Sequence, residues 1–160
     1  MRRLLVLVLL MVVAAGVAAI LLRTVARTAT TDTLTVPRGV RAVDVATDTG
    51  DIRVSGRAGA EARVAARREY SLWGPDVTDR QDGGTLVLRA DCPGFGWLTA
   101  CQGDYDVTVP RTAGVTADAD AGTVEVAGVA GPVTATSNAG AVRATALRAR
   151  RVRATTDAGD

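Results

Sequence analysis

The stretch that decides the fold is residues 115–144, VTADADAGTVEVAGVAGPVTATSNAGAVRA, in which one turn sequence occurs twice. Each occurrence has a small residue, then Asp120 or Asn138, then alanine, then Gly122 or Gly140. The two glycines are 18 positions apart, and a short alternating segment follows each of them. This spacing predicts a repeated unit of one turn and short strands.

The same turn occurs twice more, around Gly50 and around Gly159. Asp or Asn two positions before glycine can cap a turn, and glycine adopts a positive φ without strain. The turn residues of the four copies are Asp48, Gly50, Asp120, Gly122, Asn138, Gly140, Asp157 and Gly159. A period near 18 residues predicts an all-β, solenoid-like stack of short strands.

A second, longer sequence repeat indicates that the unit is duplicated. Val36-Pro37-Arg38 precedes the turn at Gly50, and Val109-Pro110-Arg111 precedes the turn at Gly122. Both copies then run strand, turn and strand as far as Gly56 and Gly128, which are 72 positions apart. We therefore expect two β modules with an insertion between them.

Alternation of apolar and polar residues predicts which side chains face inward. Between Gly122 and Gly140 the inward set is Val124, Val126, Val133 and Ala135, with Glu125 and Thr134 outward. One repeat later it is Val142, Ala144, Leu147, Val152 and Ala154. Glu125 and Arg143 occupy equivalent positions, so we expect them to pair across neighbouring strands.

The insertion predicts a hairpin. Residues 61–70 and 85–89 are typical of strands, and residues 77–84 of a polar loop. We expect residues 105–109 to pair back onto 85–89, with a long tip that carries both cysteines. Trp73, Phe95 and Trp97 lie in these loops, where they either cover the open end of a narrow core or form a contact patch for a partner.

Cys92 and Cys101 are the only cysteines, nine positions apart. A disulfide between them would place the protein in an oxidising compartment. Two unrelated buried thiols are the alternative. A metal pair is disfavoured because the chain has no His and no third Cys.

The N-terminus predicts a membrane segment. The uncharged run that starts at Leu4 and ends at Leu22 is long enough, as a helix, to cross a bilayer. We interpret residues 1–27 as an uncleaved signal anchor with basic flanks, and a cleaved signal peptide is the alternative. Residues 28–160 would then form an extracytoplasmic domain of a single-pass protein of the cell membrane.

Composition excludes several functions. The absence of His removes histidine bases and nucleophile pairs, and we expect no catalytic residue, cofactor or metal. Four Arg flank the apolar run, which leaves 15 Arg against 17 Asp and Glu in the rest of the chain. A mildly acidic domain with few aromatic residues does not fit a nucleic-acid binder.

The apolar N-terminus, the Val-Pro strands, the repeated Asp-x-Gly turns and the Cys-Pro…Cys tip resemble the bacterial "putative adhesin" β-strand-repeat family. That resemblance implies an outward-facing, membrane-tethered β-solenoid of largely uncharacterised function, and it offers no catalytic residue. Because the sequence ends directly after the fourth turn, we expect a poorly ordered C-terminus from an incomplete repeat.

We therefore expect a non-enzymatic adhesion, recognition or scaffold module whose partner is an envelope protein or a cell-wall polymer. An accessory or sensory role in an envelope stress response is the alternative. Calcium binding by the Asp turns and glycan hydrolysis by Asp118, Asp120 and Asp157 are weaker hypotheses, because turn residues at a solvated edge already have a capping role.

Overall fold

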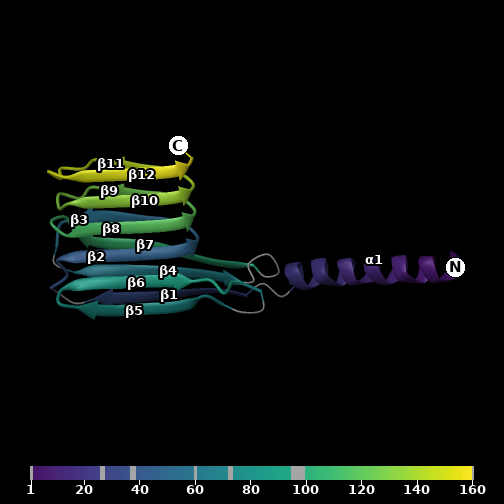
Figure 1. Ribbon diagram of the computed structural model, residues 1–160. Coiled ribbons are helices and arrows are strands. Elements are labelled where there is room, and N and C mark those ends of the chain that lie inside the picture. Colours follow the sequence, from purple (N-terminus) through teal and green to yellow (C-terminus); the bar gives the residue numbers. More distant parts are fainter. Residues whose placement is uncertain are drawn as a thin grey trace.

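One helix and twelve strands make up the described part of the chain in the computed structural model (Figure 1). The structure describes residues 2–25, 28–36, 39–59, 61–71, 74–94 and 100–159. The helix α1 (Arg2–Val25) extends away from the strands, which pack together as a separate body (Figure 1).

The strands form two six-stranded sheets. The first has the order β1-β4-β7-β3-β9-β11 and the second has the order β12-β10-β8-β2-β6-β5. The bounds are β1 Thr28–Val36, β2 Ala42–Thr49, β3 Ile52–Arg57, β4 Ala62–Tyr70, β5 Asp76–Asp82, β6 Thr85–Asp91, β7 Cys101–Pro110, β8 Gly114–Ala121, β9 Val124–Ala127, β10 Val133–Ala139, β11 Val142–Thr145 and β12 Val152–Ala158.

The two sheets face each other, with one apolar core between them. β2 contacts β7, β3 contacts β8, and β9 contacts β10 across the gap. The core is mostly Val and Ala, so the layer between the sheets is thin. Tyr105 is the one aromatic side chain of the described residues that belongs to it.

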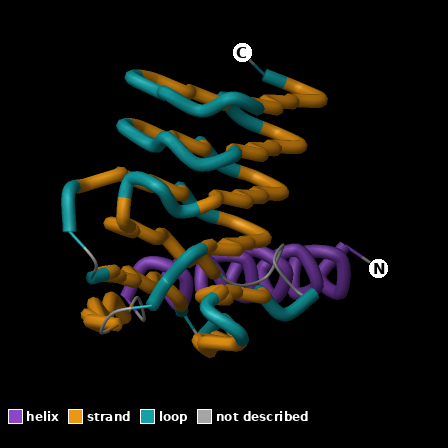
Figure 2. Tube along the Cα trace, turned by 90° about the vertical axis from the view of Figure 1, so that its left-hand side faces the viewer, coloured by secondary structure: helices purple, strands orange, loops and turns teal. Residues whose placement is uncertain are grey.

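The sequence repeat corresponds to parallel neighbours in each sheet (Figure 2). Val133 pairs with Val115 and Val142 with Val124, both 18 positions apart. The duplicated copies also lie side by side, since Val43 pairs with Val115 and Ile52 with Val124, a shift of 72 positions. Strand pairing is thus the physical basis of both periods.

The predicted fold class, a solenoid-like stack with an inserted hairpin, is wrong. The structure is two mixed sheets, because β1, β4 and β5 pair antiparallel with their neighbours. The returning strand β7 does not pair with β6 and lies in the opposite sheet, between β4 and β3. The segment predicted as a polar loop is instead strand β5, which forms a hairpin with β6.

The prediction of an N-terminal transmembrane helix is also wrong as it stands. The segment is helical, as α1. Within the described residues, however, no helix combines the length and the apolar character that a membrane span requires.

Three glycines lie at equivalent positions of neighbouring repeats, with their backbones in contact, and we call them the glycine column. Gly50, Gly122 and Gly140 have φ of +141°, +149° and +154°. A Cβ on Gly122 would collide with the carbonyl oxygen of Gly50, and one on Gly140 with that of Gly122. The backbones of successive repeats therefore meet here at a distance that excludes any side chain.

Most of the predicted inward residues are buried, except at the last repeat. Val124, Val126, Val133 and Ala135 are fully enclosed. Val152 is 45% exposed, and Ala144 and Ala154 are exposed, because β11 and β12 are the edge strands of their sheets. Glu125 pairs with Arg143 at 3.7 Å, as expected, and with Arg53 at 3.2 Å on its other side.

Side-chain hydroxyls donate hydrogen bonds to backbone carbonyls of the glycine column and of Gly103, which lies against Gly50. Thr47 donates to the Gly103 carbonyl at 3.1 Å, Ser137 to Gly122 at 2.8 Å, and Thr156 to Gly140 at 2.9 Å. Ala119 is the residue at the equivalent position of the remaining repeat, because it pairs with Ser137 on one side and with Thr47 on the other. Among the four described repeats, the one that contains Ala119 therefore lacks this side-chain hydrogen bond.

We expect Ala119→Ser to stabilise the protein, because its hydroxyl would supply the bond that Ala119 cannot make. One such bond contributes about 0.5–1.5 kcal/mol, or a few degrees in Tm for a chain of this size. Thermal unfolding of the full chain measures the gain. Ala117→Ser is the control, since it places a hydroxyl in the apolar layer away from the glycine column, and it should lower Tm. An Ala119→Ser variant with no gain would contradict this role of the hydroxyls.

Candidate functional site between the edge strands

A cavity opens where the two sheets end side by side. β1 is the last strand of the first sheet, and β5 is the last strand of the second. Between them lies a cavity of about 210 Å³. We call it the seam cavity; its lining residues are Asp32, Thr33, Leu34, Val64, Ala66, Arg68, Val77, Asp79, Leu88 and Tyr105.

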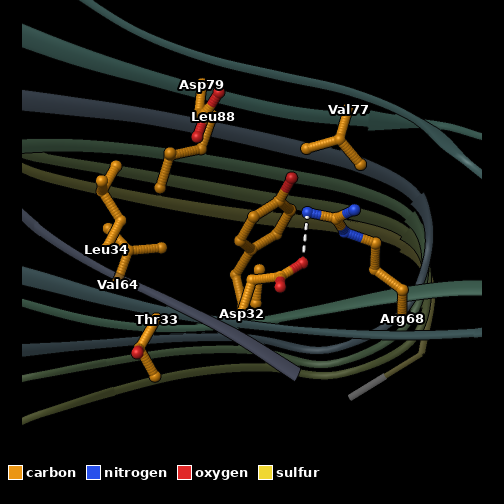
Figure 3. A pocket seen from close by; sticks show the side chains of 10 residues that line it. Asp32, Thr33, Leu34, Val64, Arg68, Val77, Asp79 and Leu88 are labelled. Carbon is orange, nitrogen blue, oxygen red and sulfur yellow. Dashed lines mark ion pairs between the residues drawn. The ribbon is translucent and has the colours of Figure 1, made fainter. Parts of the chain in front are cut away.

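The walls of the seam cavity are apolar and its polar groups are few. Leu34, Val64, Val77 and Leu88 supply hydrocarbon surface from four different strands (Figure 3). A second cavity of about 230 Å³ shares Leu34 and Asp79 with it and continues along the same two strands. Apolar walls with a few convergent polar groups are typical of a ligand site.

Arg68 reaches into the seam cavity from β4. Its Nη2 forms an ion pair with Oδ2 of Asp32 at 2.8 Å (Figure 3). Its Nε is buried and has no hydrogen-bond partner among the described residues. Asp32 therefore holds the guanidinium in place, while one donor of Arg68 has no partner among the described residues.

The second available group is the hydroxyl of Tyr105, on β7. Tyr105 is only 3% exposed, and within the described structure its hydroxyl has no hydrogen-bond partner. Burial raises its pKa to about 12; Arg68 acts in the opposite direction, and Asp79 and Asp91 add to the rise. At neutral pH the phenol is therefore protonated and can both donate and accept a hydrogen bond.

The buried phenol predicts a loss of stability in alkali. A Tyr pKa of about 12 in the folded protein, against about 10 in an unfolded chain, means that the folded state holds this proton more tightly. The free energy of unfolding is therefore unaffected by this group below pH ~10 and falls as pH rises toward ~12, by on the order of 2–3 kcal/mol, because the buried phenol resists ionisation.

Denaturant unfolding of the full chain between pH ~9 and ~12 measures this slope. Tyr70→Phe leaves Tyr105 as the single phenol, since the chain has two Tyr, so its ultraviolet titration reports Tyr105 alone. Tyr105→Phe should remove this part of the pH dependence. An unchanged slope in Tyr105→Phe would contradict the assignment.

The two cysteines form a disulfide, which confirms that prediction. Cys92 and Cys101 are joined with a Cα–Cα distance of 6.0 Å. Cys92 follows β6 of one sheet and Cys101 begins β7 of the other, so the bond links the two sheets covalently. The backbone N–H of Cys92 also donates to Oδ2 of Asp48 at 2.8 Å.

The predicted turn residues lie on the glycine column, away from the seam cavity. Asp120 Oδ1 accepts a hydrogen bond from Asn138 Nδ2 at 2.8 Å, and Asp157 lies on the edge strand β12. Among the described residues no group of three or more Cys, Asp or Glu could hold a metal ion. Trp73, Phe95 and Trp97, the predicted contact patch, lie outside the described residues.

The sequence interpretation missed Asp32, Arg68, Asp79 and Tyr105 as a group. One signal was present for Arg68: it continues the inward series Ala62, Val64 and Ala66 on β4. An arginine at an inward position predicts an internal partner. No local pattern, however, shows that β1, β4, β5 and β7 converge.

The chain matches no protein-family model, and no curated protein matches it in sequence. A crystal structure with a similar chain is that of a "putative cell adhesion protein" from Clostridium sporogenes, with a TM-score of 0.46 and 11% identity. The match covers 72% of this chain and 59% of that one, so this chain spans about three fifths of that protein's length.

Proposed function

We propose that this protein is a non-catalytic recognition module that acts outside the cytoplasm and binds a component of the cell envelope in the seam cavity. The observation that carries this proposal is a pair of buried groups on the wall of one cavity, Arg68 Nε and the Tyr105 hydroxyl, neither of which has a partner among the described residues. A buried polar group without a partner costs about 1–3 kcal/mol. A ligand that satisfies both groups explains why they are there.

Two further observations support the proposal. The disulfide between Cys92 and Cys101 fits an oxidising compartment. The raised pKa of Tyr105 makes its phenol a poor general base at neutral pH, so the group suits binding better than proton abstraction.

The full chain, immobilised and presented with separate bacterial fractions of wall polysaccharide and envelope protein, tests the proposal. We expect one fraction to be retained by the wild type. Tyr70→Phe, which leaves the cavity lining intact, is the matched control and should retain that fraction equally. Retention of neither fraction would contradict a recognition role, and turnover of a fraction by the same preparation would contradict a non-catalytic one.

A further inference from the structure

The chemistry of the seam cavity defines the class of its ligand, and this inference rests on the proposed function. Three requirements follow from the lining. The ligand must accept a hydrogen bond from Arg68 Nε, must bond the Tyr105 hydroxyl, and must present apolar surface to the aliphatic walls. It must also tolerate the two carboxylates that line the cavity, Asp32 and Asp79.

The charged residues of the lining limit the class of ligand that the seam cavity can bind. The lining holds one cation, Arg68, and two carboxylates, so its formal charge is −1. Arg68 is already paired with Asp32, so an anionic ligand would compete with Asp32 for the guanidinium and would meet unfavourable charge from Asp79. An ammonium group has no acceptor to offer Arg68 Nε. A neutral group that both donates and accepts, the hydroxyl, meets each requirement.

The volume of the seam cavity limits the size of the ligand. The seam cavity holds about 210 Å³, below the ~300–1,000 Å³ of pockets that enclose drug-sized ligands. It therefore suits a single small ring. The adjoining cavity of about 230 Å³ adds Arg80 and Gln81 along the same seam. A second ring would have polar partners there.

We infer that the seam cavity binds the terminal one or two units of a neutral glycan. The C–H faces of a sugar ring pack on Leu34, Val64 and Leu88. Its hydroxyls accept from Arg68 Nε and exchange hydrogen bonds with Tyr105, and Asp79 serves as an acceptor at the mouth. Asp32 is a positioning residue, since its ion pair orients the guanidinium.

Thermal unfolding of Tyr105→Phe gives a second test of this inference. A buried phenol hydroxyl without a partner does not stabilise the unliganded fold, so Tyr105→Phe should unfold at the same temperature as the wild type or slightly above it. Loss of binding in a variant that is no less stable separates a ligand-binding hydroxyl from a structural one.

The test uses the full chain with ¹³C-labelled tyrosine rings and NMR titration. The chain has two Tyr, so Tyr70→Phe assigns the Tyr105 signal and serves as the control. The probes are glucose, galactose, mannose, N-acetylglucosamine and the disaccharides lactose and cellobiose, with glucuronate and methylammonium as charged comparisons. We expect at least one neutral sugar to shift the Tyr105 signal saturably, and the charged probes to leave it unchanged.

Two variants complete the test. Arg68→Lys keeps the positive charge beside Asp32 but lacks the Nε donor, and Tyr105→Phe lacks the hydroxyl. Each should weaken sugar binding at least about tenfold, which corresponds to one hydrogen bond. For Tyr105→Phe, a backbone amide spectrum replaces the tyrosine signal.

The outcomes distinguish this inference from the proposed function. A Tyr105 signal that responds to no neutral sugar, or responds equally to a charged probe, overturns the glycan inference. If the wild type retains the envelope-protein fraction, Tyr105→Phe loses it and no sugar binds, recognition in the seam cavity stands while the glycan inference fails. If nothing is retained and no sugar binds, both proposals fail.

Discussion

Replacing Gly122 with alanine should abolish or severely reduce the stability of the sheets. Gly122 has a φ of +149°, and an added Cβ would collide with the backbone carbonyl of Gly50 in the neighbouring repeat. Backbone strain of this kind costs about 1–3 kcal/mol, and overpacking costs about the same again. Since a domain is stable by only about 5–15 kcal/mol, we expect Tm to fall by about 10 °C or more.

Two glycine variants separate the collision from the strain. Gly59 has a φ of +135° and open space around its Cα, so Gly59→Ala tests strain alone. Gly94 has neither a positive φ nor a close neighbour, and Gly94→Ala should leave Tm nearly unchanged. Thermal unfolding of the three variants should rank Gly122→Ala well below Gly59→Ala, and Gly59→Ala below Gly94→Ala. Equal values for Gly122→Ala and Gly59→Ala would show that close contact in the glycine column does not limit the fold.

Removing the disulfide should produce the second large loss. The bond between Cys92 and Cys101 closes a short loop that joins the two sheets. A loop of about ten residues gives about 2–3 kcal/mol through the lower entropy of the unfolded chain. The double variant Cys92→Ala, Cys101→Ala should therefore unfold about 4–12 °C lower than the oxidised wild type.

Reduction is the internal control for this prediction. A reducing agent should lower the Tm of the wild type toward that of the double variant and should leave the double variant unchanged. If the oxidised wild type and the double variant unfold at the same temperature, the bond does not contribute to stability, and its link to an oxidising compartment loses its structural basis.

The sequence predicted the local structure of the repeats well, because local structure there depends on local residues. Gly122 and Gly140 require turns, and the alternation around Val124 and Val133 fixes the side that faces the core. The sheet assignment of the insertion could not be predicted in this way. Whether β7 pairs with β6 or with β4 depends on contacts between segments far apart in the chain. Gly83-Gly84, both with a positive φ, is a local hairpin signal for β5 and β6 that the loop prediction for residues 77–84 did not use.

The seam cavity could not be predicted for the same reason, since its residues come from five strands of two sheets. Only the placement of β1 and β5 at matching edges brings Asp32 and Asp79 to one opening. Tyr105 by itself is compatible with an ordinary core residue. Its significance depends on the absence of a partner for its hydroxyl in the described structure, which no pattern in the sequence reveals.

Filling the seam cavity is the most direct test of whether it is the binding site. Ala66 lines the cavity and is 8% exposed. Leucine in its place would occupy part of the space with apolar atoms without altering Arg68 or Tyr105. We expect Ala66→Leu to lose retention of the envelope fraction that the wild type retains, with a Tm no lower than that of the wild type, because the added atoms fill an existing cavity. Undiminished retention by a folded Ala66→Leu variant would contradict the assignment of recognition to this cavity.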